Sequence, residues 1–161
     1  MDVDWNGIMK TEDLLPMDIR ERASVDGNEY AWRMEDVKAA ILAAKPLSLA
    51  TLGGQTQYRL PQGTYEMYWL NFDPPEKKTI ETWDEYVVRS ADDAIQMFET
   101  MCNSTCFEQE GVLNIQSVRD AVNNGRMDLS QYLCFVVYFV TEDEYRDLSA
   151  RAQQSRHKLQ R

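Results

Sequence analysis

Histidine is nearly absent from this 161-residue sequence, and its single copy, His157, lies in a basic segment at the C-terminal end. Ser-His-Asp and Cys-His nucleophiles, and zinc sites built on histidine, need an imidazole held in a packed pocket. A terminal segment seldom supplies such a pocket. The sequence therefore argues against the commonest hydrolytic and zinc-dependent sites, and we expect no cofactor and no metal.

Cysteine, proline and glycine are also scarce, with 3, 5 and 7 copies. The odd number of cysteines, with Cys134 inside an apolar run, suits a reducing compartment. Cys102 and Cys106 have helical spacing but no further ligands beside them, so we interpret the thiols as inert. No apolar run approaches the roughly 20 residues that cross a bilayer, and the acidic start is unlike a signal peptide. We expect a cytoplasmic protein without a membrane partner.

Acidic residues outnumber basic ones by 27 to 17, which gives a net charge of −10. Residues 148–161 hold four basic and no acidic residues, so the excess of acid belongs to residues 1–147. Such a body repels phosphate backbones and attracts basic proteins. We therefore expect a basic protein partner and no nucleic acid, although the same charge could serve solubility alone.

The length suits one domain, residues 1–161, with an acidic lead-in (1–29) and a basic C-terminal tail (151–161). Helical spacing predicts helices at 33–44, from Ser90 onward, at 115–122, and from Glu142 after a Thr-x-x-Glu capping box. The apolar run 132–140 is rich in β-branched and aromatic residues and predicts a central strand covered on both faces.

Residues 47–72 have the pattern of a three-strand meander. Gly53-Gly54 predicts a first tight turn, and Pro61-Gln62-Gly63 predicts a second turn with a bulge. With the strand at 132–140, this meander gives an α+β fold: one domain with an antiparallel sheet of four or five strands, packed with three or four helices.

The bulged second turn would place Tyr58 opposite Glu66 and Gln57 opposite Met67. Side chains alternate between the two faces of a strand, so this register predicts one core-like face that includes Glu66. The other face combines glutamines, an arginine and large apolar side chains, types that are common in protein interfaces. We predict that it binds the partner, unless a helix covers it; its residues are Gln55, Gln57, Arg59, Tyr65, Met67 and Trp69.

These patterns favour an acidic, cytoplasmic protein-binding module without catalytic residues, of which a bacterial immunity or antitoxin-type inhibitor of a basic nuclease-like toxin is the concrete version. A second hypothesis is a carboxylate-dependent hydrolase, in which burial raises the pKa of Glu66 and Asp73 is the second acid. Glu66 would otherwise be bonded to Tyr58 or to an arginine. A third hypothesis is a scaffold subunit of a homo-oligomer, and the sequence leaves the oligomeric state open.

Overall fold

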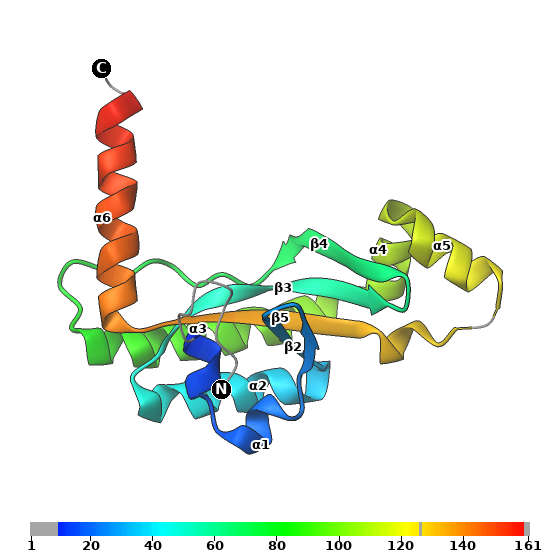
Figure 1. Ribbon diagram of the computed structural model, residues 1–161, viewed down its shortest axis with the longest axis horizontal. Helices are drawn as coiled ribbons and strands as arrows, with labels where there is room; N and C mark the ends of the chain where they lie inside the picture. The colour runs from blue at the N-terminus through cyan, green and yellow to red at the C-terminus, as the bar shows by residue number, and fades with distance from the viewer. Residues whose placement is uncertain (1–9, 126, 160–161) are drawn as a thin grey trace.

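The computed structural model describes residues 10–125 and 127–159 and has the predicted α+β fold, with one antiparallel sheet of five strands in the order β1-β2-β5-β3-β4 (Figure 1). The strands are β1 (Ser24–Asp26), β2 (Glu29–Trp32), β3 (Ala50–Leu60), β4 (Gly63–Asn71) and β5 (Leu133–Val140). Six α-helices occur in the described residues, more than the three or four predicted: α1 (Met17–Arg20), α2 (Met34–Ala44), α3 (Trp83–Ser104), α4 (Phe107–Asn114), α5 (Gln116–Asn123) and α6 (Glu142–Leu159).

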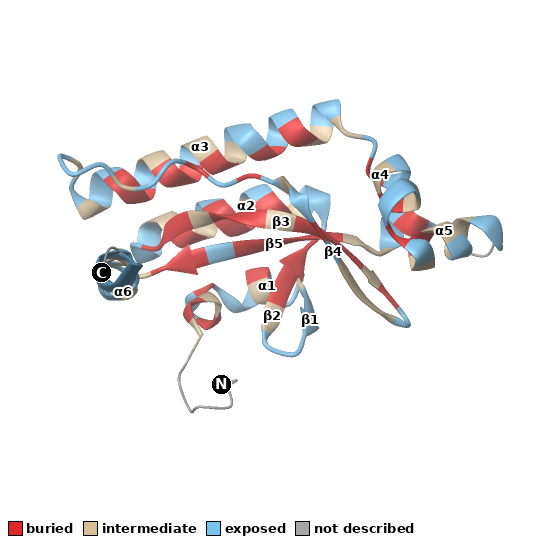
Figure 2. Ribbon diagram, turned by 90° about the horizontal axis from the view of Figure 1, so that it is seen from above, coloured by how far each residue is buried: buried red, intermediate tan, exposed pale blue. Residues whose placement is uncertain are grey.

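The main core lies between the sheet and the two helices α2 and α3, which cover one face of it (Figure 2). The central strand β5 points Phe135, Val137 and Phe139 into this core, where the Phe98 ring of α3 packs edge-on against Phe135 at 5.0 Å. Helices α4 and α5 lie at one end of the sheet and α6 at the other. The predicted central strand is confirmed.

Helix α3 begins earlier than its apolar stripe predicted. Thr82 caps it, because its hydroxyl accepts from the Glu85 N–H (3.2 Å) and the Glu85 carboxylate accepts from the Thr82 N–H (2.8 Å). The predicted start at Ser90 is wrong: Ser90 is buried inside α3, and its hydroxyl accepts from the backbone N–H of Thr51 (3.1 Å). A small polar residue in this helix joins it to the sheet.

The predicted turn at Gly53-Gly54 is also wrong, because both glycines lie inside β3, which runs unbroken from residue 50 to 60. The pairing with β5 shifts by one residue between Thr51 and Gly53, and Gly53 has φ 136°. A Cβ atom on Gly54 would overlap the ring of Phe72. The glycines therefore form a bulge against which the segment after β4 can pack closely. Glycine inside a strand commonly marks such a bulge or close approach.

A two-residue turn, Pro61-Gln62, joins β3 to β4 in place of the predicted bulged turn. Tyr58 pairs with Tyr65, and Gln57 with Glu66, so the predicted register is off by one residue. A shift of one residue moves every β4 side chain to the opposite face. The glutamines and Arg59 therefore share a face with Glu66, while Tyr65, Met67 and Trp69 belong to the helix-covered face.

Strands β1 and β2 form a hairpin that begins in the predicted acidic lead-in and ends three residues beyond it, at Trp32. It joins the sheet through β2, where Ala31 pairs with Val136 and Trp32 with Phe135. The hairpin then curls over the face that α2 and α3 leave open, so that the Thr64 hydroxyl of β4 donates to the carboxylate of Asp26 in β1. The two edge strands of the sheet thus meet through their side chains.

Helix α6 begins at the predicted capping box, in which the Glu144 carboxylate accepts from the Thr141 N–H (3.1 Å). The Tyr145 ring packs against Trp83 and Tyr86 of α3. Beyond this first turn the helix projects from the body, and it continues to Leu159, through the predicted basic tail (Figure 1).

Candidate functional site

The six residues that the sequence singled out for partner binding do not form one surface. Gln57 and Met67 are fully buried, and Tyr65 is half-buried with its hydroxyl 2.8 Å from the Ser117 hydroxyl of α5. Trp69 is 39% exposed, and its indole N–H donates to Glu110 of α4 (3.1 Å). The register places Gln55 on the opposite face of the sheet, where it is half-buried.

Arg59 holds the β1–β2 hairpin against the open face of the sheet. Its side chain, only 10% exposed, donates to the backbone carbonyls of Ser24 (2.9 Å) and Glu29 (3.1 Å) and to Gln57 Oε1 (3.2 Å). Gln57 in turn donates to Glu29 Oε1 (2.9 Å), and Glu29 accepts at its other oxygen from the Tyr138 hydroxyl (3.1 Å). Arg59 and Gln57 thus stabilise the fold and are closed to a partner.

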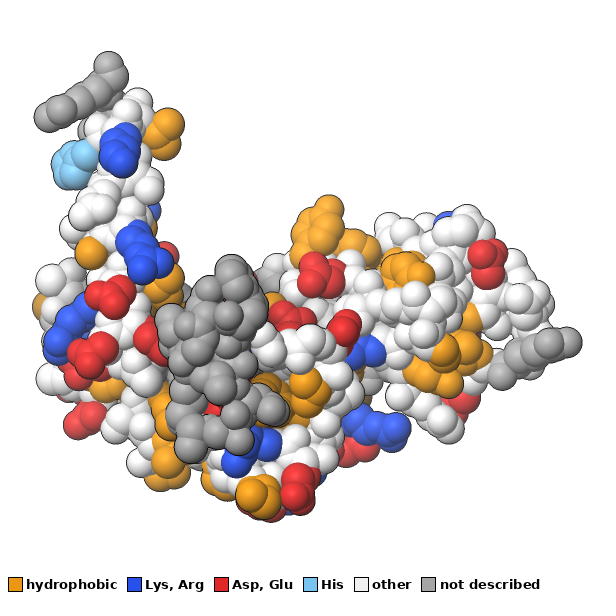
Figure 3. Space-filling view, viewed as in Figure 1, with side chains coloured by type: hydrophobic (Ala, Val, Ile, Leu, Met, Phe, Trp, Pro, Cys, Tyr) orange, Lys and Arg blue, Asp and Glu red, His pale blue; other side chains and the backbone are white. Residues whose placement is uncertain are grey.

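An open cleft of about 630 Å³ lies between this hairpin, strand β4 and the start of α5. Three carboxylates line it, those of Asp26, Glu29 and Glu66, and no lysine or arginine of residues 10–125 and 127–159 does so. The rest of its lining consists of polar side chains, the ring of Tyr65 and the aliphatic side chain of Ile115. We call it the acidic cleft. Figure 3 shows carboxylates grouped over this part of the sheet, next to exposed apolar side chains.

Glu66 is the free carboxylate of the acidic cleft. Asp26 is bonded to Thr64 and Glu29 to Gln57, Arg59 and Tyr138, whereas Glu66 is exposed and makes no hydrogen bond or ion pair with the described residues. Glu66 can therefore accept a cation without giving up an existing contact.

Tyr138, on the open face of the sheet, lies within the electrostatic influence of several carboxylates. Burial raises the pKa of Tyr138, and the charges of Glu29, Glu66 and Glu12 raise it further. Tyr68, two residues beyond Glu66 on the same side of β4, is 71% exposed. The acidic cleft therefore supplies negative charge, as expected for an electrostatically steered protein contact, while Tyr68 lies outside its lining.

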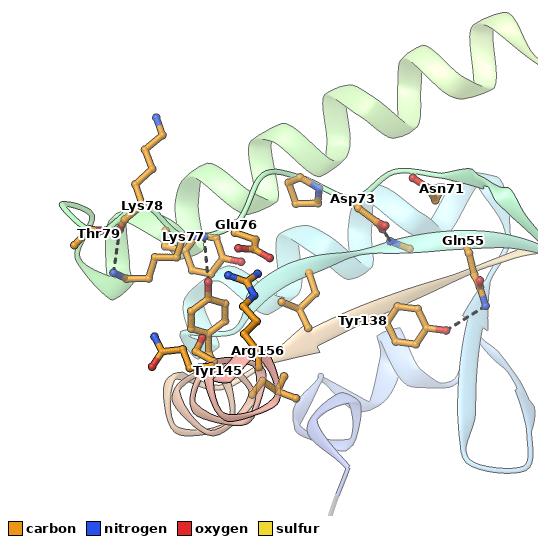
Figure 4. Close-up of a pocket in the computed structure, with 18 of the residues that line it drawn as sticks. Gln55, Asn71, Asp73, Glu76, Lys77, Lys78, Thr79, Tyr138, Tyr145 and Arg156 are labelled. Carbon is orange, nitrogen blue, oxygen red and sulfur yellow. Dashed lines mark hydrogen bonds between the residues drawn. The ribbon is translucent and has the colours of Figure 1, made fainter. Parts of the chain in front are cut away.

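A second, larger cavity of about 940 Å³ lies at the other end of the sheet, between α6 and the loop that follows β4. Figure 4 shows Arg156 and Tyr145 on the α6 side, Lys77 and Glu76 on the loop side, and Tyr138 on the sheet. We call it the α6 groove. Its lining mixes both signs of charge with tyrosines, so it lacks the acidic bias of the cleft.

The loop that walls the α6 groove is fastened to α3 by Arg89. This guanidinium donates to the carbonyls of Pro75 (3.2 Å) and Glu76 (3.0 Å) and forms ion pairs with Glu81 and Asp93. Hydrogen bonding to Arg89 lowers the pKa of Glu81 to about 2. The loop is therefore a fixed wall of the groove.

The two carboxylates of the hydrolase hypothesis are not brought together. Glu66 is exposed and lines the acidic cleft, whereas Asp73 lines the α6 groove and accepts from the Gly54 N–H (3.2 Å). Glu66 pairs with Gln57, whereas Asp73 is bonded to Gly54, three residues away along β3, which separates the two backbones by roughly 10 Å. Paired glycosidase carboxylates lie about 5 to 9.5 Å apart. Burial raises the pKa of Asp73, and the acid that lines the same groove is Glu76 rather than Glu66.

The three cysteines differ in their environment. Burial raises the pKa of the Cys102 and Cys134 thiols to about 11, and Cys106 is exposed at the start of α4. In residues 10–125 and 127–159, no three His, Cys, Asp or Glu side chains are grouped as a metal site. No helix in that part of the chain has the length and apolar character needed to span a bilayer.

Sequence reasoning missed Asp26 and Glu29, because the β1–β2 hairpin was not predicted. The signal was the dipeptide Gly27-Asn28, which suits a two-residue hairpin turn between the paired residues Asp26 and Glu29. Gly27 has φ 60°, as such a turn needs.

Comparisons of this chain with protein-family models, with curated proteins and with solved structures give no match.

Proposed function

We propose that this protein binds a basic protein through the acidic cleft, and that the partner is a nuclease-like toxin which it occludes in the manner of an immunity protein. The observation that carries the proposal is the composition of the cleft: three carboxylates and, among the residues that the structure describes, no lysine or arginine in its lining. The net charge of −10 adds a long-range attraction for the same kind of partner.

A lysine or arginine side chain of the partner fits this cleft in two ways. Its charged group meets the unpaired carboxylate of Glu66, and its aliphatic stem packs on Tyr65 and Ile115. Because a nuclease presents basic residues to phosphates, carboxylates spaced over a sheet can occupy the same residues.

The first experiment identifies the partner by comparing baits. Wild-type protein, Glu66→Lys and Glu99→Lys are used to capture proteins from a lysate of the source organism. Glu99 is a matched control, because its side chain is 53% exposed on α3, where it pairs with Lys38 away from the cleft. We expect one basic protein to be retained by the wild type and the control and lost with Glu66→Lys. Equal capture by all three baits would contradict the assignment of the cleft.

The second experiment tests the mechanism with the purified partner. We expect the association rate to fall steeply between about 50 and 500 mM salt while dissociation changes much less, because screening acts on the encounter of charged surfaces. A nuclease assay then decides the inhibitor function, since the wild type should abolish cleavage and Glu66→Lys should not. An association rate that salt leaves unchanged would show that the charge serves solubility alone.

A further inference from the structure

We propose that helix α6 is the dimerisation element of this protein, and that it pairs antiparallel with the α6 of a second copy of the chain. This proposal concerns the opposite end of the sheet from the acidic cleft and does not depend on the function proposed above. Four features carry it: the exposure of α6, its stripe of apolar and small residues, the order of its charges, and the α6 groove beside it.

Helix α6 lacks the packing that a helix of this length needs. It contains 18 residues, and none of them is buried. Every described side chain from residue 150 to 159 is exposed. Isolated helices of fewer than about 12 to 15 residues are marginal in water, and most helices in proteins are stabilised by packing along one face. We therefore expect the projecting part of α6 to pack against another surface, which would stabilise it.

One face of α6 has the spacing of a two-helix interface. Tyr145, Leu148, Ala152, Ser155 and Leu159 follow the alternating steps of three and four residues that define positions a and d of a heptad. Tyr145 already packs on the body, while Leu148 and Leu159 are 51% and 87% exposed. The small residues between the two leucines allow close approach of another helix.

The charges of α6 are separated along its length. Residues 142–147 hold four acidic residues and one arginine, whereas residues 148–159 hold Arg151, Arg156 and Lys158 and no acid. The described ion pairs of α6 are those of Arg146 with Glu142 and Asp143, so they all lie in its first half. A parallel pair of such helices would oppose like charges, and an antiparallel pair opposes acid to base.

The apolar stripe and the charges specify the same antiparallel register. If Leu148 packs beside Ala152 of the second copy, position 142 lies on the same side as position 156 of the other helix. That places Glu142 against Arg156, and on the other flank Glu144 against Lys158, twice each by symmetry. A self-complementary sequence of this kind favours a second copy over an unrelated helix.

The α6 groove provides room for the incoming helix. Leu148, Ala152 and Arg156 line it from α6, and Tyr68 and Tyr138 line it from the sheet. Figure 4 labels Arg156 and Tyr138 among them. In an antiparallel pair, the last turn of the second copy's α6 enters the groove, so that the Leu159 of that copy reaches Tyr68 and Tyr138. The second copy then completes the open side of the cavity.

Sedimentation equilibrium of the full chain, combined with circular dichroism, tests the proposal. We expect a reversible dimer of the 18.7 kDa chain at low salt, weakened at about 500 mM salt by screening of the four charge pairs. Leu148→Glu should abolish the dimer. Gln154→Glu, on the side of α6 opposite the stripe, is the matched control and should leave the dimer intact.

A charge-swap pair makes the test specific for the antiparallel register. Glu142→Lys and Arg156→Glu should each weaken self-association by about tenfold or more, because each places like charges opposite one another twice. An equimolar mixture of the two variants should recover a dimer close to the wild type, because the mixed pair restores opposite charges at both positions. Circular dichroism checks that each variant keeps its helix content.

Three results would overturn the proposal. A wild-type chain that stays monomeric up to millimolar concentration would show that α6 has no copy of itself as partner. A dimer that survives Leu148→Glu would place the interface elsewhere. Variants that weaken the dimer separately but fail to recover it on mixing would exclude the antiparallel register.

Discussion

Replacement of Arg59 by alanine should release the β1–β2 hairpin from the sheet and cost more stability than any single surface charge. The side chain is 10% exposed and donates to two backbone carbonyls and to the fully buried Gln57. A buried acceptor left without its donor costs about 1–3 kcal/mol. The two carbonyls lie at the sheet edge, where water can replace part of the loss.

These contributions together predict a loss of about 2–4 kcal/mol for Arg59→Ala, to which the ion pair with the 32% exposed Glu29 adds little. For a chain of this length each kcal/mol lowers Tm by about 2–4 °C, so we expect a fall of roughly 10 °C. Urea unfolding followed by circular dichroism measures the free energy directly. The hairpin should also become accessible to proteases near Gly27.

Arg22→Ala is the matched control, because Arg22 is 45% exposed and forms surface ion pairs with Asp18 and Asp36. Such pairs contribute at most about 1 kcal/mol. The double variant Gln57→Leu/Arg59→Met should recover part of the loss, because it removes buried donor and acceptor together. If Arg59→Ala costs no more than Arg22→Ala, the reasoning about the clamp is wrong.

Three further variants probe other features. Gly54→Ala should cost about 1–3 kcal/mol in urea unfolding, because the added methyl group overlaps the segment after β4, whereas Gly63→Ala, which meets only ordinary contacts, should change little. Glu81 has its pKa lowered to about 2 from the usual 4.5, so its stabilisation is present above about 4.5 and is lost as pH falls towards 2. Glu81→Gln should therefore destabilise the protein at pH 7 and much less at pH 2; an equal loss at both pH values would contradict this sign. With a thiol reagent at pH 8, Cys106 should react first and the two thiols with a pKa of about 11 far more slowly, whereas equal rates would contradict their burial.

The parts of the fold that could be predicted are long periodic segments and helix starts marked by a single capping sequence with no competitor nearby. The run 132–140 could only be a buried strand, and Thr141 with Glu144 defined the start of α6. The start of α3 was missed because Thr82 and Glu85 form an equally good capping box before its apolar stripe begins. Competing local signals of similar strength cannot be ranked without knowing what packs nearby.

The candidate site was less predictable, because a turn that is longer or shorter by one residue changes which side chains lie on the same face. Gly53-Gly54 fits a turn and a bulge equally well, and only the approach of Phe72 decides between them. The turn at Pro61-Gln62 is one residue shorter than predicted, which alone exchanged Glu66 for Met67 on the open face. The acidic cleft also needs the hairpin of residues 24–32, and although Gly27-Asn28 marks its turn, no local pattern shows that this hairpin packs beside Glu66.

The place of β5 in the sheet has a consequence for how the protein acquires its structure during synthesis. This strand follows the other four in the chain, yet it lies between β2 and β3 and pairs with both. Until residues 133–140 leave the ribosome, the β1–β2 and β3–β4 hairpins have no strand to join them, and a two-stranded hairpin alone is marginal in water. Such non-local pairing also slows folding. The nascent chain therefore carries the apolar faces of these strands uncovered until β5 has been synthesised, and the sheet can close only then.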